Sequence, residues 1–230
     1  LTPADLNAVS RDLAARLGSA AGRLEALEER GKASRTVIAR SLASVAFLQG
    51  AYGYREAASG RFLRHMIDGE GRKLLSPVGQ PLLTLEGDGP VAERQYTGTG
   101  FAVADPAAVV TNRHVALPWE KDASIEMMAA QGLEPVMLRL IAYFPGEPRA
   151  RAMRLVRAGD ESDLAVLAFQ DVDGTGAPLG APGLRLAGAP PAPGSEVIVL
   201  GYPTGLRALL AQTGPAFVRK LQADNALDFW

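Results

Sequence analysis

Hydrophobic residues recur with a helical period over residues 2–30. Apolar side chains follow steps of three and four residues, with Ser10 as the one polar member, at Leu6, Leu13, Leu17, Ala20, Leu24 and Leu27. Thr2, Pro3 and Asp5 supply a capping hydroxyl, a proline at the first helical position and an acid three residues after the cap. Gly31 is typical of a residue at which a helix ends. The pattern predicts a helix over residues 2–30.

The apolar positions of this helix form a narrow seam, and charged residues occupy the other positions. Such a seam is typical of a coiled coil and of a helix that docks on a neighbouring surface. Two interpretations stay open. Residues 2–30 pack on their own domain, or they mediate self-association or bind a partner helix.

After the helix, the hydrophobic pattern becomes strand-like. Ser44–Tyr54 is apolar and aromatic, Ala58–Arg61 has the composition of a turn, and Phe62–Ile67 is apolar again. We interpret the two apolar runs as a β-hairpin, and the preceding helix could persist as far as Ser44. His65 lies on the second run, where a surface or half-buried structural role is favoured over catalysis.

Further short hydrophobic runs between Gly- and Pro-containing turns predict more strands. They are Pro81–Leu85, Gly100–Ala104, Ala107–Thr111, Pro135–Phe144, Arg149–Arg157, Leu164–Phe169 and Glu196–Gly201. A turn at Asp105-Pro106 joins two of them, and Leu206–Trp230 has helical spacing. Many short strands at close spacing predict a mainly β fold, a barrel or sandwich with one N-terminal α-helix.

Composition narrows the possible functions. With 230 residues, 47% of them hydrophobic, the chain can bury a substantial core as one large domain or two small ones. The net charge is −1 and the basic residues are scattered, which disfavours nucleic-acid binding because that needs clustered positive charge. No hydrophobic run reaches the ~18 residues of a membrane span.

The cysteine and histidine counts exclude several kinds of site. A chain without cysteine can form neither disulfides nor thiolate metal sites. Two histidines and no His-Glu-x-x-His segment leave little from which to build a zinc enzyme. We therefore expect neither a metal nor another cofactor.

His114 follows the β-branched run that ends at Thr111, where a rigid strand can aim a side chain. Taken alone, a histidine in this place is more often structural than catalytic. A hydroxyl nucleophile needs a base, and the base needs a carboxylate that fixes its tautomer. Asp163 is the best candidate carboxylate, because it follows a turn and starts a predicted buried strand. Asp160 and Glu161 have the character of solvated turn residues.

Three motifs, in the expected order, resemble those of a known family. Thr97-Gly-Thr-Gly-Phe101 followed by Val110-Thr-Asn-Arg-His-Val115 is similar to a Gly-Ser-Gly-Phe and Leu-Thr-Asn-x-His-Val signature. Ser162-Asp-Leu-Ala-Val-Leu167 is similar to the segment that holds the triad aspartate, and Pro193–Gly205 resembles the stretch that opens the second barrel. On these residues the chain resembles the trypsin-like serine proteases, in particular the bacterial HtrA-like branch.

The resemblance implies a trypsin-like double β-barrel, with the active site in the cleft between two six-stranded barrels. It also implies a protein or peptide substrate and an extracytoplasmic or periplasmic location. By the match, His114 would be the general base of a serine endopeptidase and Asp163 the carboxylate that orients it.

The nucleophilic serine of this family lies in a Gly-x-Ser-Gly-Gly motif, expected after Gly205 and not present in the chain. Ser195 is not followed by two glycines, and we assign it to a turn. Thr204 and Thr213 also lack flanking glycines. We expect a complete first barrel, a second barrel that is only begun, and a serine beyond residue 230, so that this chain alone is inactive.

Two alternatives to a truncated protease stay open. The chain could be a degenerate protease fold that serves as a binding or scaffold module through its N-terminal helix, or a second chain could supply the serine. The predicted organisation has three parts: a coiled-coil-like helix (1–34), a first β-barrel with His and Asp (35–190), and the start of a second barrel with a helical segment (191–230). Because the first residue is Leu, we expect the sequence to begin inside a longer protein.

Overall fold

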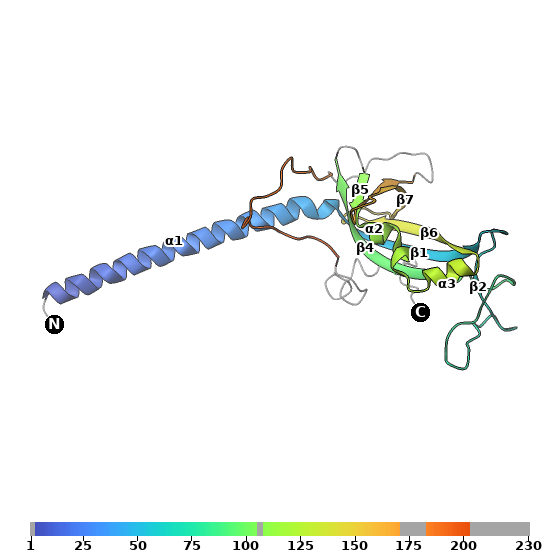
Figure 1. The fold of residues 1–230 in the computed structure, drawn as a ribbon. Helices are drawn as coiled ribbons and strands as arrows, with labels where there is room; N and C mark the ends of the chain where they lie inside the picture. The colour runs from blue at the N-terminus through green and yellow to red at the C-terminus, as the bar shows by residue number, and fades with distance from the viewer. Residues whose placement is uncertain (1–2, 105–107, 171–182, 203–230) are drawn as a thin grey trace. The chain divides into compact units, whose positions relative to one another are not determined.

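The computed structural model describes residues 3–104, 108–170 and 183–202 (Figure 1). Its helical segments are α1 (Pro3–Ser41), η1 (Leu42–Ser44), α2 (Arg113–Ala116), η2 (Pro118–Lys121) and α3 (Ile125–Ala130), of which η1 and η2 are 3₁₀ turns. Its strands are β1 (Val45–Glu56), β2 (Arg64–His65), β3 (Leu83–Thr84), β4 (Arg94–Val103), β5 (Ala108–Thr111), β6 (Leu133–Tyr143), β7 (Arg151–Ala158) and β8 (Ala165–Phe169). The chain divides into two compact units, residues 1–42 with 191–200 and residues 43–190 with 201–230.

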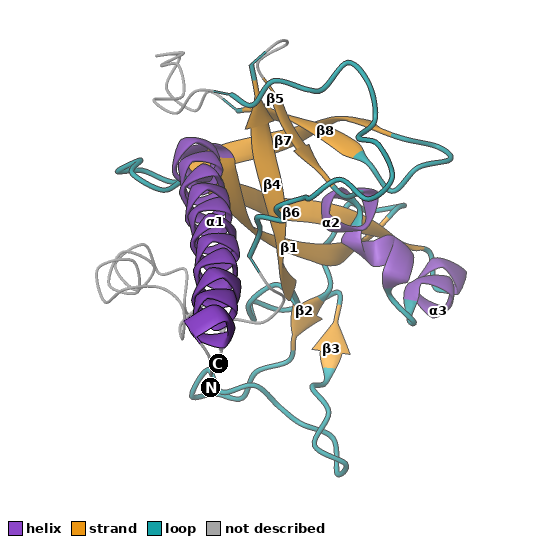
Figure 2. Cartoon of the chain, turned by 90° about the vertical axis from the view of Figure 1, so that its left-hand side faces the viewer, coloured by secondary structure: helices purple, strands orange, loops and turns teal. Residues whose placement is uncertain are grey.

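Six strands of the second unit form a closed antiparallel barrel in the order β1-β4-β5-β8-β7-β6. The long strand β1 pairs with β4 on one side and with β6 on the other (Figure 2). Its register places Val45 opposite Phe101 of β4 and Phe47 opposite Tyr143 of β6. The predicted mainly β fold, with a barrel and an N-terminal helix, is confirmed.

Apolar side chains fill the centre of the barrel. Leu48, Val109 and Leu167, on β1, β5 and β8, are fully buried. Each such side chain removed from water contributes about 1.5–3 kcal/mol to the free energy of folding. Gly100 on β4 faces the same core and has no room for a side chain, because a Cβ would lie 2.8 Å from Val109 Cγ1. Because apolar side chains fill the centre of the barrel, polar groups that could take part in a reaction are expected at the ends of the strands.

The N-terminal helix is longer than predicted, because α1 continues through Gly31 to Ser41. A glycine inside a helix costs only about 1 kcal/mol relative to alanine. Lys32 Nζ pairs with Glu29 Oε1 at 2.8 Å across this turn, which supports its helical conformation. The predicted end at Gly31 is therefore wrong. The alternative, a helix persisting toward Ser44, is the one observed, since η1 follows α1 directly.

The leucine seam of α1 is exposed to solvent. Leu13, Leu17, Leu24 and Leu27 are each 58–64% exposed. In the same unit, Arg30 Nη2 pairs with Glu196 Oε1 at 3.2 Å. Self-association and the binding of a partner helix stay predictions. None of the described helices combines the length and the hydropathy that a bilayer crossing requires.

The hairpin predicted over Ser44–Ile67 is only partly correct. The first run forms β1, but β1 pairs with β4 and β6 rather than with the second run. The second run pairs only with the end of β1, where Arg55 lies opposite Phe62 and the Leu63 N–H donates to Tyr54 O at 2.8 Å, and it then forms β2. β2 pairs with β3, so that His65 lies opposite Leu83. Hydrophobic alternation indicates a strand, but it does not identify the strand's partners.

The strand predicted at Glu196–Gly201 is wrong, because the structure assigns no strand to these described residues. Val197 and Val199 are 67% and 89% exposed, so the side chains of this apolar run are not buried. The turn predicted at Asp105-Pro106 and the helix predicted over Leu206–Trp230 lie outside the described residues, as does most of the expected second barrel. The three-part domain organisation stays a prediction.

Candidate active site

His114 lies on the short helix α2, directly after β5. The strand ends at Thr111, Asn112 keeps an extended backbone (φ −75°, ψ 148°), and the chain then turns into α2. Val115 and Ala116 of this helix are buried, whereas the side chain of His114 is 47% exposed. The buried neighbours fix the helix on the barrel and leave the imidazole accessible.

A glycine of β4 makes room for α2 on the barrel. A Cβ at Gly98 would lie 2.6 Å from Val115 Cγ1, much closer than non-bonded carbon atoms approach. Thr111 Oγ1 donates a hydrogen bond to Thr99 O at 2.7 Å, which ties the end of β5 to the same strand. Gly98 therefore opens the space that holds the residue after His114.

Asp163 precedes β8 and is brought to His114 by strand register. β5 and β8 are antiparallel, with Thr111 opposite Ala165. In an antiparallel pair the end of one strand lies beside the start of the other. The segment after Thr111 therefore meets the segment before Ala165, although they are far apart in sequence.

Hydrogen bonds join His114 and its neighbour Asn112 to Asp163. The His114 Nδ1 atom lies 2.7 Å from Asp163 Oδ2, and the His114 backbone N–H donates to Oδ1 at 2.9 Å. Asn112 Nδ2 donates to the backbone oxygen of Asp163 at 3.1 Å. The hydrogen bonds that reach the carboxylate, above all the one from the His114 N–H, hold the pKa of Asp163 below its ordinary value. The carboxylate is ionised at neutral pH and oriented on the ring.

An ionised Asp163 that accepts a hydrogen bond from Nδ1 selects one tautomer of His114. The proton then resides on Nδ1, and Nε2 carries the lone pair. Nε2 can accept a proton from a hydroxyl group, and the carboxylate stabilises the imidazolium that forms. The structure thus brings together the two predicted site residues in an arrangement suited to general-base chemistry. Their catalytic roles stay a prediction.

The structure also describes the surroundings of His65 and Ser195. His65 is half-buried on β2, and burial, with a contribution from Lys73, lowers the pKa of its imidazole. Its backbone N–H donates to Pro90 O at 2.9 Å. Ser195 closes a turn, in which its N–H donates to Ala192 O at 3.0 Å.

The sequence pattern did not reveal a buried polar cluster around Asp122. The side chain of Asp122 is 2% exposed and accepts hydrogen bonds from Tyr52 OH at 2.9 Å and Tyr54 OH at 2.7 Å. Arg94 Nη1 also pairs with Asp122, and Ser124 donates through its N–H at 2.9 Å and its hydroxyl at 2.7 Å. The spacing of Tyr52 and Tyr54 could have indicated the cluster, because residues two apart on a strand share one face. The cluster anchors the end of η2 to β1 and β4.

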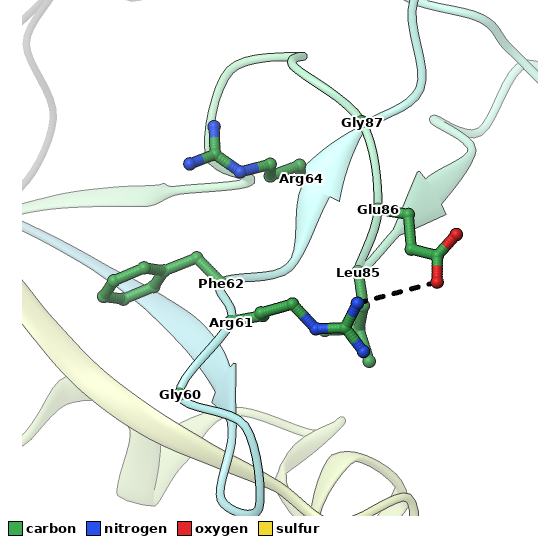
Figure 3. Close-up of a pocket in the computed structure, with 7 residues that line it drawn as sticks. All are labelled: Gly60, Arg61, Phe62, Arg64, Leu85, Glu86 and Gly87. Carbon is green, nitrogen blue, oxygen red and sulfur yellow. Dashed lines mark ion pairs between the residues drawn. The ribbon is translucent and has the colours of Figure 1, made fainter.

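A surface pocket of about 480 Å³ is lined by Gly60, Arg61, Phe62, Arg64, Leu85, Glu86 and Gly87 (Figure 3). Arg61 pairs with Glu86 at 3.5 Å, and Arg64 donates to Gly89 O at 2.8 Å. Both guanidinium groups are thus engaged with the protein itself, and the lining includes neither residue of the His–Asp pair. Within the described parts of the chain, no group of three or more metal-ligating side chains occurs. We assign this pocket no ligand.

Comparison with known proteins identifies the family. Among solved structures, an HtrA-type protease, AlgW, with a decapeptide aligns with a TM-score of 0.33 and 15% identity, covering 65% of this chain and 34% of that one. The chain thus spans about a third of that neighbour's length. A search of curated proteins finds no match. The model of the trypsin-like peptidase domain matches residues 98–226, which is 129 of the 230 residues. The chain belongs to the trypsin-like peptidase family.

Proposed function

We propose that the full-length protein is a serine endopeptidase of the HtrA type, which hydrolyses peptide bonds in proteins or peptides by acyl transfer. His114 serves as the general base, and Asp163 orients it. The 2.7 Å contact between His114 Nδ1 and Asp163 Oδ2 carries the proposal. Membership of the trypsin-like peptidase family supports the reaction class.

In the proposed reaction, a serine hydroxyl attacks the carbonyl carbon of the scissile peptide bond while its proton passes to His114 Nε2. The carboxylate of Asp163 stabilises the imidazolium. His114 then gives the proton to the leaving amine, and an acyl-enzyme forms. Water, deprotonated by the same base, hydrolyses the acyl-enzyme and regenerates the serine.

We place the nucleophilic serine downstream of residue 230, because the sequence contains no Gly-x-Ser-Gly-Gly segment. Ser195 is held in a turn, and Thr204 and Thr213 lie outside the described residues. On this proposal the 230-residue chain contributes the base and the orienting carboxylate but is inactive alone.

Fluorophosphonate labelling and peptide cleavage by the full-length protein test the proposal. His114→Ala should abolish both. His65→Ala makes the same chemical change at the other histidine and should preserve both. A folded wild-type protein that takes up no label would refute the endopeptidase function, and a fully active His114→Ala variant would refute the role of His114.

A non-catalytic scaffold is the second candidate function. The missing serine motif favours it, and so does the exposed leucine seam of α1, whose members Leu13, Leu17, Leu24 and Leu27 could contact a partner helix. In this function the barrel is a scaffold and needs no base. Cleavage of peptides by the full-length protein that depends on His114 would reject the scaffold alternative.

A further inference from the structure

Arg113 directly precedes His114 and contacts both segments that carry the His–Asp pair. Its Nε and Nη2 donate to Glu120 Oε2 and Oε1 at 2.9 and 2.6 Å, which forms a bidentate ion pair. Its Nη1 donates to Gly159 O at 2.6 Å. One guanidinium therefore links the segment downstream of His114 to the turn that ends at Asp163.

The turn between Gly159 and Asp163 is compact. The Gly159 N–H donates to Leu164 O at 2.8 Å, and this bond closes the turn at its base. A Cβ at Gly159 would overlap Ser162 Oγ, so this end of the turn has no room for a side chain. A contact that holds Gly159 O therefore also limits where the Asp163 carboxylate can lie.

The side chains of the Arg113–Glu120 ion pair are less exposed to solvent than those of His114 and Asp163. The side chains of Arg113 and Glu120 are 29% and 36% exposed, against 47% and 54% for His114 and Asp163. Bidentate arginine–carboxylate pairs fix geometry as well as charge. Their mutual hydrogen bonds lower the pKa of Glu120 and raise that of Arg113, so the ion pair is formed at neutral pH.

We propose that Arg113 is a positioning residue, which holds the turn bearing Asp163 against the segment bearing His114. The inference rests on the proposed function of these two residues as orienting carboxylate and base. Arg113 does not touch the reacting atoms; it limits the separation between His114 Nδ1 and Asp163 Oδ2. A lysine cannot reproduce its contacts, because one ammonium group lacks the planar fork that binds two carboxylate oxygens and a carbonyl.

NMR of the 230-residue chain tests the proposal through the tautomer of His114 and the titration of Asp163. The chain contains two histidines, so a His65→Gln variant assigns the ring nitrogen signals. In the wild type we expect the proton on Nδ1 and an Asp163 carboxyl with a lowered pKa. In Arg113→Met we expect a mixture of tautomers and an Asp163 pKa that moves back toward its ordinary value.

Arg139→Met is the matched control, because Arg139 pairs in the same bidentate way with Glu93, at 3.0 and 3.2 Å. It should leave the signals of the His–Asp pair unchanged. Glu120→Gln is the second test variant, since it removes the charge that anchors Arg113. It should shift the same signals in the same direction by a smaller amount.

A folded Arg113→Met variant with wild-type His114 and Asp163 signals would overturn the proposal. If this variant does not fold, wild-type signals in Glu120→Gln overturn it instead. These measurements need no nucleophile. Failure of fluorophosphonate labelling in the full-length protein would therefore refute the proposed function without deciding the positioning role.

In an active full-length protein, the same substitution has a kinetic signature. Misplacing a base by a fraction of an ångström to 1 Å lowers turnover strongly, so Arg113→Met should reduce kcat about 10- to 100-fold with little change in KM. Arg113→Lys should recover only part of the loss. A wild-type kcat in Arg113→Met would contradict the proposal, as would a change confined to KM.

Discussion

The buried Asp122 cluster allows a quantitative prediction about stability. Tyr54→Phe removes a hydroxyl that donates to Asp122 Oδ2 at 2.7 Å and otherwise preserves the ring. Water cannot replace this donor, because the Asp122 side chain is only 2% exposed. Hydrogen bonds to charged groups contribute about 1.5–3 kcal/mol. We expect the free energy of unfolding to fall by about that amount, measured by urea unfolding of the 230-residue chain.

Two further variants calibrate this prediction. Tyr96→Phe removes the hydroxyl of a half-buried tyrosine, whose partner is the weak acceptor Met137 Sδ at 3.4 Å. Its cost should stay below about 1 kcal/mol. Asp122→Asn removes the buried charge that accepts hydrogen bonds from Tyr52, Tyr54 and Arg94 and should cost about 3 kcal/mol or more. Equal losses in Tyr54→Phe and Tyr96→Phe would show that the charge on Asp122 does not strengthen the hydrogen bond.

The pH dependence of stability tests the same cluster. Burial alone raises the pKa of Asp122, but hydrogen bonds from the Ser124 N–H, the Tyr54 and Ser124 hydroxyls and Tyr52 lower it well below its ordinary value. A lowered folded-state pKa stabilises the protein above the unfolded-state pKa of about 3.9, and this stabilisation is lost as the pH falls toward the folded-state pKa. The stability difference between the wild type and Asp122→Asn should therefore shrink below about pH 4. A difference that stays constant down to pH 2 would refute the reasoning.

Three other substitutions test the packing, the site and the helix. Gly98→Ala places a Cβ against Val115 and should lower the free energy of unfolding, measured in urea, by about 1–3 kcal/mol. A double variant with Val115→Ala should recover part of this loss. Strictly additive losses of the two substitutions would contradict the contact. Asp163→Asn should lower kcat of an active full-length protein by about 10,000-fold, and near-normal turnover would exclude the orienting role. Leu13→Asp combined with Leu24→Asp should reduce the mass measured by light scattering if α1 self-associates, and an unchanged mass would reject self-association.

The sequence predicted the strands that bound the site because their signals are local. β5 and β8 are short apolar runs between turns, and His114 and Asp163 lie within three residues of the end of β5 and the start of β8. The partners of β1 could not be predicted in this way. Its first ten residues are buried, and both of its edges are covered by β4 and β6, whose pairing depends on chain closure over long distances. The hairpin prediction assumed the nearest run as the partner, and tertiary packing overrode it.

The predicted helix end and the predicted last strand failed for a related reason. A glycine such as Gly31 permits a helix to end but does not require it, and favourable residues beyond it carried α1 on to Ser41. An apolar run such as Glu196–Gly201 becomes a strand only where a sheet edge accepts its backbone hydrogen bonds. Whether a helix ends at a glycine, and whether an apolar run forms a strand, depends on the surroundings of these residues rather than on their type.

The contacts that fix the segment from Arg113 to Asp122 divide into two kinds that mutation can separate. At its end, Asp122 is buried among hydroxyl groups and a guanidinium, so its loss should lower the free energy of unfolding by several kcal/mol. At its start, Arg113 forms a partly exposed ion pair with Glu120, of a kind that contributes little to the free energy of unfolding. Arg113→Met should therefore change the tautomer of His114 with little loss of stability, and Asp122→Asn should do the reverse as long as the barrel stays folded. If both variants changed the tautomer of His114 and also lowered the free energy of unfolding, the segment would move as one body. The same contacts would then determine both the stability and the geometry of the site.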